Sequence, residues 1–230
     1  METIAIITAR GGSKRIPRKN IRPFCGKPII VYSIEAALIS GIFDEVMVST
    51  DDEEIADVAR QAGAKVPFMR SAATSSDYAT TRDVLLEVLD EYEKRGQTYD
   101  IMSCIYPTAP FVTAEKLRRG YQTLIESDAD SLTPVVQFSY PPQRAFVVED
   151  GCLVFQHPEY RLSRSQDLQP VYHDCGQFYF YRVPAYRTKP AGEERILPLV
   201  MPEEETQDID NYSDWELAEV KYRRFILKES

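Results

Sequence analysis

The 230-residue sequence has no apolar run approaching the ~20 residues that a membrane-spanning helix needs. Its first residues, Met1-Glu2-Thr3, lack the basic start of a secretion signal. There is no Cys-x-x-Cys pair, and the scattered cysteines argue against a disulfide framework or a zinc site: Cys25, Cys104, Cys152 and Cys175. A net charge of −9 argues against a general nucleic-acid binder. We therefore expect a soluble, cytoplasmic protein that binds neither membrane nor nucleic acid.

Acidic residues are also absent from one long stretch, Thr3 to Ile34, which contains seven Lys and Arg residues. The rest of the chain has 20 basic and 36 acidic residues, so positive charge is concentrated near the N-terminus. An apolar run at 4–7 is followed there by Thr8-Ala9-Arg10-Gly11-Gly12-Ser13-Lys14-Arg15-Ile16-Pro17-Arg18-Lys19-Asn20. Glycines expose backbone N–H groups and cations add charge, so the pattern predicts a phosphate-binding loop after a buried strand. A turn with solvated cations is the alternative, since the Walker and Gly-x-Gly-x-x-Gly patterns are both absent.

Strand and helix patterns alternate along most of the chain, which predicts a mostly parallel sheet with helices on both faces, in one domain spanning 1–230. Ligands of such sheets bind beyond the carboxyl ends of the strands. The glycine loop, Asp51-Asp52 and Pro107-Thr108 all fall at such ends. Residues 137–172 break the alternation and predict a small β-rich excursion. We expect strands at 4–7, 45–50, 65–68, 100–106, 131–136 and 177–181, and helices at 28–40, 52–62, 80–95, 113–127 and from about 212.

The run Ala-Arg-Gly-Gly-Ser-Lys-x-x-Pro-x-Lys-Asn, at 9–20, resembles the nucleotide-binding signature of the CMP-nonulosonic acid synthetases. The likeness recurs along nearly the whole chain, and Arg-Ile-Pro-Arg-Lys-Asn is most similar to the pseudaminic acid branch of that family. The resemblance implies a Rossmann-like three-layer α/β/α nucleotidyltransferase that uses CTP and a nine-carbon keto-acid sugar. It also implies a homodimer, with 137–172 as a dimerisation and substrate excursion.

Two segments match the nucleotide-binding parts of the family. The resemblance implies catalytic roles for Arg10, Lys14 and Lys19, with nucleotide contacts from Ala9, Arg10, Gly11, Gly12, Ser13, Lys14, Lys19 and Asn20. The family holds cytosine and ribose with the segment matching Arg70 to Thr81, which implies roles for Arg70, the backbone of Ala79, and Thr81. From the residues alone, the hydroxyls and Asp77 of that segment equally suit the cap of the following helix.

Asp208 and Asp210 are two residues apart, so in an extended segment their carboxylates face the same side. Such a pair suits a hard divalent cation, Mg²⁺ or Mn²⁺, completed by water and phosphate. The surroundings also fit a solvated acidic face, since 196–220 contains eight Asp and Glu and no Lys or Arg. The resemblance favours the metal, because the family has an Asp-x-Asp metal pair just before its last helix. Both residues are then catalytic as well as metal-binding.

Polar residues of the second half suit a sugar acid, because Arg recognises carboxylates and Gln bonds hydroxyls or amides. We expect Arg164, Gln166 and Gln177 to contact the sugar, with Tyr106 at its boundary with the nucleotide. Sialic acid synthetases carry Gln-Pro-Thr-Ser-Pro where this chain reads Tyr106-Pro107-Thr108-Ala109-Pro110, which favours the pseudaminic branch.

The predicted reaction is transfer of CMP from CTP to a nonulosonic acid, most consistent with pseudaminic acid, with release of pyrophosphate. In-line attack by the anomeric hydroxyl needs no covalent intermediate, and no nucleophilic triad pattern is present. Legionaminic or N-acetylneuraminic acid is the alternative acceptor. A nucleotide-binding regulatory module without turnover is the alternative of another class.

Overall fold

The apolar run after the N-terminus forms β1 (Thr3–Thr8), an interior strand of the sheet. Ile4 and Ile6 point to one face of the sheet, Ala5 and Ile7 point to the other, and all four are fully buried. A continuous apolar run is what a strand covered on both faces requires. The computed structural model describes residues 1–190 and 192–229.

Within the described residues the sheet has seven strands, most of which run parallel to one another. In addition to β1 it contains β4 (Glu45–Ser49), β5 (Ile101–Ile105), β6 (Ser131–Gln137), β9 (Tyr172–Asp174), β10 (Phe178–Arg182) and β11 (Ile196–Val200). The order is β11-β6-β10-β5-β1-β4, and β9 pairs with β6 outside this path. Strand β10 lies antiparallel between β5 and β6, whereas β4, β1 and β5 are parallel and β11 is parallel to β6. The mostly parallel sheet predicted from the sequence is thus confirmed, with two reversed strands: β10 inside the sheet and β9 paired with β6.

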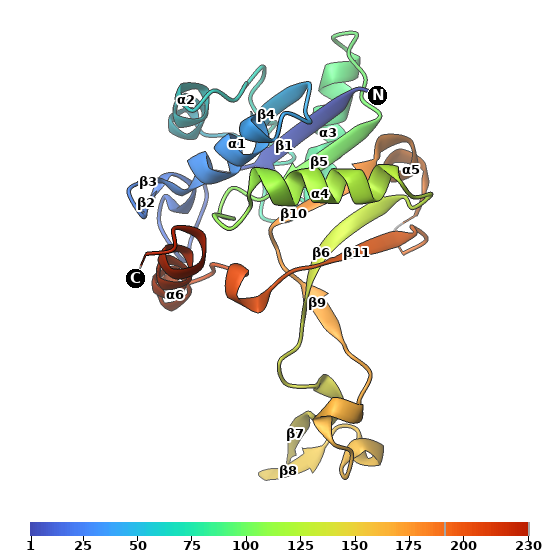
Figure 1. Ribbon diagram of the computed structural model, residues 1–230. Helices are drawn as coiled ribbons and strands as arrows, with labels where there is room; N and C mark the ends of the chain where they lie inside the picture. The colour runs from blue at the N-terminus through green and yellow to red at the C-terminus, as the bar shows by residue number, and fades with distance from the viewer. Residues whose placement is uncertain (191, 230) are drawn as a thin grey trace.

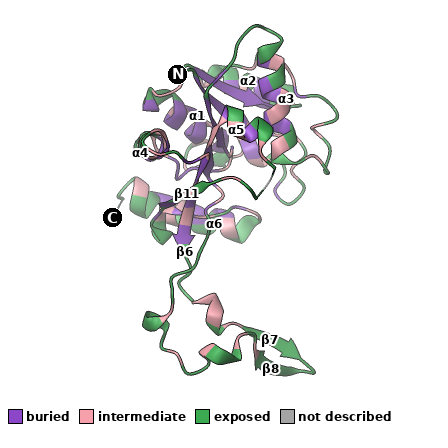
Figure 2. Cartoon of the chain, turned by 90° about the vertical axis from the view of Figure 1, so that its right-hand side faces the viewer, coloured by how far each residue is buried: buried purple, intermediate pink, exposed green. Residues whose placement is uncertain are grey.

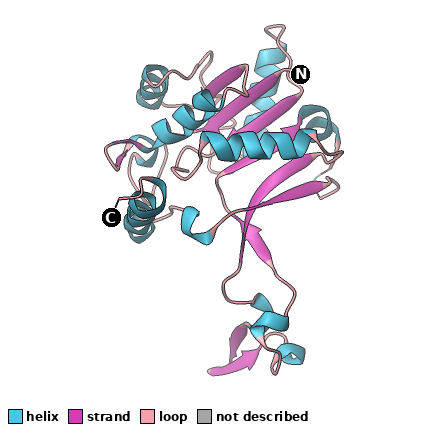
Figure 3. Ribbon diagram, viewed as in Figure 1, coloured by secondary structure: helices cyan, strands magenta, loops and turns pink. Residues whose placement is uncertain are grey.

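Helices cover both faces of the sheet, which makes three layers (Figures 1 and 3). They are α1 (Ile29–Ser40), α2 (Glu53–Gln61), α3 (Thr81–Glu93), α4 (Ala114–Ile125) and α5 (Val183–Thr188). Apolar side chains of α1, α2 and α4 share a core with Ala5 and Ile7, and those of α3 and α5 share one with Ile4 and Ile6. Helix α1 ends at Gly41 with φ 66°, a conformation that favours glycine. No helix of the described residues is long and apolar enough to cross a bilayer.

A third cluster joins the C-terminal helix α6 (Tyr212–Lys221) to a small hairpin, β2 (Pro23–Phe24) and β3 (Lys27–Pro28). The ring of Phe24 lies edge-on to Trp215 and to Tyr222, at 5.5 Å in both pairs. Ile16 of the glycine loop and Ile209 of the acidic segment are buried in the same cluster. Packing of α6 therefore brings the basic loop and the acidic segment together.

Residues 138–171 project from the body of the molecule on the β6 and β9 stem (Figure 1). They hold the hairpin β7 (Phe146–Glu149) and β8 (Cys152–Phe155) and three short turns, Pro142–Arg144, Pro158–Tyr160 and Ser165–Asp167. Figure 2 shows that this excursion is largely exposed, in contrast to the purple strands of the body. Val148 and Leu153 are 71% and 69% exposed, which is unusual for apolar side chains.

The structure corrects some of the expected elements. The strand expected at 65–68 is wrong, because only Lys65 bridges to Met47, and Pro67 lacks the N–H that further pairing needs. Five of the described strands and helices were not expected: β2, β3, β9, α5 and β11. Strand β11 contains Pro198, which is tolerated because β11 is an edge strand. After α6 the chain widens into a π turn, Tyr222–Ile226, in which Tyr222 is buried and Phe225 is 41% exposed.

Replacing Trp215 by Ala should lower the free energy of unfolding by about 3–5 kcal/mol, because it empties the centre of the third cluster. Leu217→Ala in the same helix is the control and should change it by less than about 0.5 kcal/mol, since Leu217 is 47% exposed. Urea unfolding of both variants measures this, and equal losses would contradict the role of the cluster.

Candidate active site

A cleft of about 810 Å³ lies at the carboxyl ends of β1 and β5 and at the start of α3. Five cationic and three anionic side chains face it, in a chain whose net charge is −9. Its lining is Thr8, Arg10, Ser13, Lys14, Arg15, Lys19, Asn20, Arg70, Thr74, Ser76, Asp77, Ala79, Thr80, Thr81, Val84, Tyr106, Pro107, Thr108, Asp208 and Asp210. The location agrees with the rule that α/β sheets bind ligands beyond their strand ends.

The glycine loop is held from outside the cleft by the acidic residues that follow β4. The N–H of Gly11 donates to Asp51 Oδ1 at 2.9 Å, and a Cβ on Gly11 would lie 2.7 Å from Asp52 Oδ2. Only glycine permits this approach. Arg18, in the left-handed region with φ 55°, pairs with Asp52 at 2.5 Å and with Glu54. Asp51 and Asp52 therefore hold the loop in place and do not line the cleft, and the Gly11 N–H is already engaged.

Two cations of the loop converge on one carboxylate. Arg10 Nη1 and Lys14 Nζ donate to the two oxygens of Asp77, at 2.9 and 2.5 Å. Asn20 Nδ2 donates to the Arg10 carbonyl at 2.9 Å, which fixes the backbone from which the Arg10 side chain extends. Arg10 and Lys14 thus surround a position that suits an anion.

The acidic pair faces the cleft from the other side. Asp208 and Asp210 line it, while Ile209 between them is buried in the third cluster, which is the alternation expected of an extended segment. Arg15 pairs with Asp210 at 2.7 Å, and Lys19 Nζ donates to the Ile209 carbonyl at 2.7 Å. Basic loop and acidic segment are thus in direct contact.

The contact between the basic loop and the acidic segment affects the pKa values of two groups, Asp208 and Lys19. Burial and the neighbouring Asp210 raise the pKa of Asp208, and Lys19 opposes them. Burial lowers the pKa of Lys19, and the carboxylates of Asp210 and Asp208 oppose it. Two carboxylates beside an open cleft are suitable oxygen ligands for a hard divalent cation. The described residues contain no group of three or more His, Cys, Asp or Glu side chains arranged to hold a metal ion.

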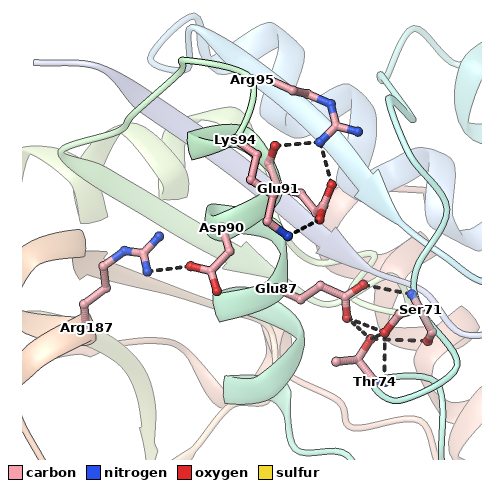
Figure 4. A network of polar contacts seen from close by, with 8 residues as sticks. All are labelled: Ser71, Thr74, Glu87, Asp90, Glu91, Lys94, Arg95 and Arg187. Carbon is pink, nitrogen blue, oxygen red and sulfur yellow. Dashed lines mark hydrogen bonds and ion pairs between the residues drawn. The ribbon is translucent and has the colours of Figure 1, made fainter.

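Arg70 closes the floor of the cleft next to β4. It is 9% exposed, and its Nε and Nη2 donate to the hydroxyl and carbonyl of Ser49 at 3.0 and 2.6 Å. The chain that follows is attached to α3, because Glu87 accepts hydrogen bonds from Ser71 and from the hydroxyl of Thr74 (Figure 4). This part of the loop is therefore positioned by a helix.

Thr80, at the end of that loop, is the residue that caps α3. Thr80 Oγ1 accepts from the Asp83 N–H, and Asp83 accepts from the Thr80 N–H, which is a complete capping box. Asp77 is left to pair with the loop cations. Ala79 and Thr81 line the cleft beside the cap.

Tyr106 stands between this cleft and a second one of about 400 Å³. Its N–H donates to the Gln177 carbonyl at 2.9 Å, and its carbonyl accepts from the Ser33 hydroxyl at 2.8 Å. The second cleft is lined by Thr81, Arg82, Tyr106, Ser131, Thr133, Asp174, Tyr179, Tyr181, Tyr186, Glu194 and Ile196. Thr81 and Tyr106 are common to both, so the two clefts adjoin.

The structure places the other expected site residues outside both clefts. Ala9 is buried, and its N–H continues the pairing of β1 by donating to Ser49 at 2.9 Å, while Gly12 lies in the loop without lining the cleft. Gln177 is 1% exposed and donates to the Glu205 carbonyl at 3.0 Å; its Oε1 has no partner within the described residues. It thereby holds the acidic segment against β10.

Arg164 and Gln166 lie on the excursion, away from the clefts of the same chain. Arg164 pairs with Asp167 at 2.7 Å and is exposed.

The sequence did not predict that the side chains of Asp77, Arg15 and Asp174 line the clefts. The first two stood inside recognised segments, but their direction depends on the folded loop.

The model of a family described as cytidylyltransferase matches residues 4–191 of the chain. The chain therefore belongs to the cytidylyltransferase family and is an enzyme of that class. It is 43% identical, over 97% of both chains, to a pseudaminic acid cytidylyltransferase of Campylobacter jejuni. A CMP-N,N'-diacetyllegionaminic acid synthase of Legionella pneumophila is 32% identical over 95% of both chains. The resemblance seen in the sequence motifs is confirmed.

Solved structures confirm the fold. A CMP:2-keto-3-deoxy-manno-octonic acid synthetase, complexed with CTP, has a TM-score of 0.69 at 21% identity and covers 96% of this chain and 98% of its own. A 4-diphosphocytidyl-2C-methyl-D-erythritol synthase from Anaerococcus prevotii has a TM-score of 0.67 at 13% identity, covering 97% of this chain and 99% of its own. The predicted three-layer nucleotidyltransferase fold is thus correct.

Replacing Arg10 by Ala should lower turnover by about 100- to 1000-fold, because a charged contact to the anion position is lost. Unfolding by urea should be unchanged, since the Arg10 side chain is 42% exposed and packs in no core. Arg60→Ala, an exposed cation of α2, is the control and should retain turnover. Full activity in a folded Arg10→Ala variant would contradict a role of the glycine loop in the reaction.

Proposed function

We propose that the protein transfers CMP from CTP to a nonulosonic acid, with pseudaminic acid as the acceptor, and releases pyrophosphate. The observation that supports this most is the meeting of a cationic loop and a carboxylate pair across one cleft. Nucleotidyl transfer needs both, because the triphosphate must be held while charge develops at the α-phosphate and the leaving pyrophosphate. The name of the relative that is 43% identical favours this acceptor.

In this proposal the triphosphate lies where the cations converge. Arg10 and Lys14 would exchange Asp77 for phosphate oxygens, and Ser13, which lines the cleft, would approach from the loop. Ribose and cytosine would lie along Arg70, the Ala79 backbone and Thr81. The N-terminus of α3 begins there and adds the positive end of a helix dipole.

Asp208 and Asp210 would hold Mg²⁺ or Mn²⁺ against the phosphates. When bound, the ion would neutralise developing charge and lower the pKa of a coordinated hydroxyl. Lys19 positions this pair by donating to the Ile209 carbonyl between the two carboxylates, and Arg15 orients Asp210. These contacts hold the acidic side chains toward the α-phosphate site.

The acceptor would occupy the second cleft, with its anomeric hydroxyl reaching past Tyr106 for in-line attack on the α-phosphate. Arg164 and Gln166 are too remote to reach it within one chain. We propose that the excursion joins two copies through its exposed apolar hairpin, which would bring these two residues to the partner's cleft. An exposed apolar patch of this kind is typical of an interface.

Asp208→Asn and Asp210→Asn should each lower turnover by at least about 100-fold or demand much more metal, because one charged oxygen ligand is lost. Titration of Mn²⁺ binding by electron paramagnetic resonance gives a readout independent of turnover. Glu204→Gln, exposed on the same acidic segment, is the control. Unchanged turnover of wild type in excess chelator would contradict the metal assignment.

The acceptor is tested by measuring pyrophosphate release at fixed CTP with pseudaminic, legionaminic and N-acetylneuraminic acids. We expect kcat/KM to be highest for pseudaminic acid, by as much as ~10⁴-fold over the sialic acid, because a polar site rejects analogues that leave its groups unpaired. A preference for N-acetylneuraminic acid would overturn the acceptor and leave nucleotidyl transfer standing.

A further inference from the structure

The two adjoining clefts differ in charge. The first cleft, where the proposed function places the nucleotide, has more cations than anions; it is called the nucleotide cleft or basic cleft below. The second cleft, called the acidic cleft, contains one cation, Arg82, and two anions, Asp174 and Glu194. Arg82 is already engaged, because Nη2 donates to the Tyr186 carbonyl at 2.6 Å and its guanidinium lies 4.6 Å above the Tyr186 ring. The second cleft therefore offers negative charge to a ligand.

Asp174 is held in this cleft by hydrogen bonds to its carboxylate. It ends β9, opposite Val135 of β6. Its carboxylate accepts the Tyr179 hydroxyl at 2.8 and 2.9 Å and the N–H of Gly176 at 2.7 Å. Gly176 has φ 62°, a conformation that favours glycine, so the turn that presents this N–H depends on it. Each carboxylate oxygen has two lone pairs, so acceptor capacity remains for a ligand.

The Asp174 carboxylate is also linked to the nucleotide cleft. The ring of Tyr179 lies edge-on to Tyr106 with 5.5 Å between centroids. Tyr106 in turn lines both clefts. Asp174, Tyr179 and Tyr106 therefore form one continuous wall that leads from the acidic cleft to the basic one.

The chemistry of the acceptor matches this polarity, an argument that rests on the proposed function. A nonulosonic acid has its carboxylate on the anomeric carbon, and its hydroxyl and acylamido donors on distal carbons. The anomeric end must reach the α-phosphate in the basic cleft, so the carboxylate lies where cations are. The distal donors then lie in the acidic cleft, beside Asp174.

We propose that Asp174 is a specificity-determining residue of the acceptor site. It accepts a hydrogen bond from a hydroxyl or acylamido N–H at the distal end of the sugar acid. Its negative charge also repels the acceptor's carboxylate, which excludes the reversed orientation of the sugar. Tyr179 is a positioning residue, because its hydroxyl fixes the carboxylate.

The test is Asp174→Asn, which keeps the shape and removes the charge, with Asp128→Asn as a matched control on the loop before β6. Pyrophosphate release is measured with varied pseudaminic acid at saturating CTP, and with varied CTP. We expect kcat/KM for the acceptor to fall about 10- to 100-fold, mainly through KM, with KM for CTP unchanged. Tyr179→Phe should produce a smaller loss of the same kind, and Asp128→Asn none.

Three results would overturn the proposal. A lower KM for the acceptor in Asp174→Asn would mean that the carboxylate lies beside Asp174. An unchanged KM would mean that no donor reaches it. Equal rises in both KM values would indicate a structural role.

If wild type releases no pyrophosphate, the proposed function fails. Calorimetric binding of pseudaminic acid to wild type and Asp174→Asn then decides the role of Asp174 separately.

Discussion

The site depends on the burial of Ile16 and Ile209 in the aromatic cluster of Phe24, Trp215 and Tyr222. These two apolar residues belong to segments that are almost 200 residues apart, one strongly basic and one strongly acidic. Apolar burial is non-directional, but here it determines the registry of two charged segments. In this arrangement the Lys19 ammonium donates to the Ile209 carbonyl and Arg15 pairs with Asp210.

Opposite charges in one cleft need to be separated, or they would only neutralise each other. The separation is partial: Lys19 donates to the Ile209 carbonyl instead of a carboxylate, whereas Asp210 pairs with Arg15, and both carboxylates line the cleft. Asp51 and Asp52, which follow β4, hold the glycine loop from the side away from the cleft. Asp51 accepts a hydrogen bond from the Gly11 N–H, and Asp52 pairs with Arg18. Arg10 and Lys14 are exposed and both pair with Asp77. Because exposed ion pairs contribute little free energy, replacing Asp77 by another anion costs little.

Much of this could be predicted from the sequence, because it depends on local periodicity and turn chemistry. The apolar run of β1 predicts a doubly covered strand, and Gly41 predicts the end of α1. The spacing of Asp208 and Asp210 predicts carboxylates on one side with Ile209 opposite, as observed. Other features needed long-range information. The reversal of β10, and the burial of Gln177 under the acidic segment, follow from which strands pair, and no local pattern encodes that.

Sequence alone therefore determined the class of fold, the basic loop and the acidic pair, since strand and helix periods and glycine turns are set by near neighbours. Tertiary structure decided which groups meet. It turned Asp51 and Asp52 toward the back of the loop and Asp77 toward its cations. It also placed Arg164 on a projecting excursion and joined a second, acidic cleft to the first across Tyr106. Those outcomes depend on packing between elements distant in sequence, where burial and charge select one arrangement among many that local propensity permits equally.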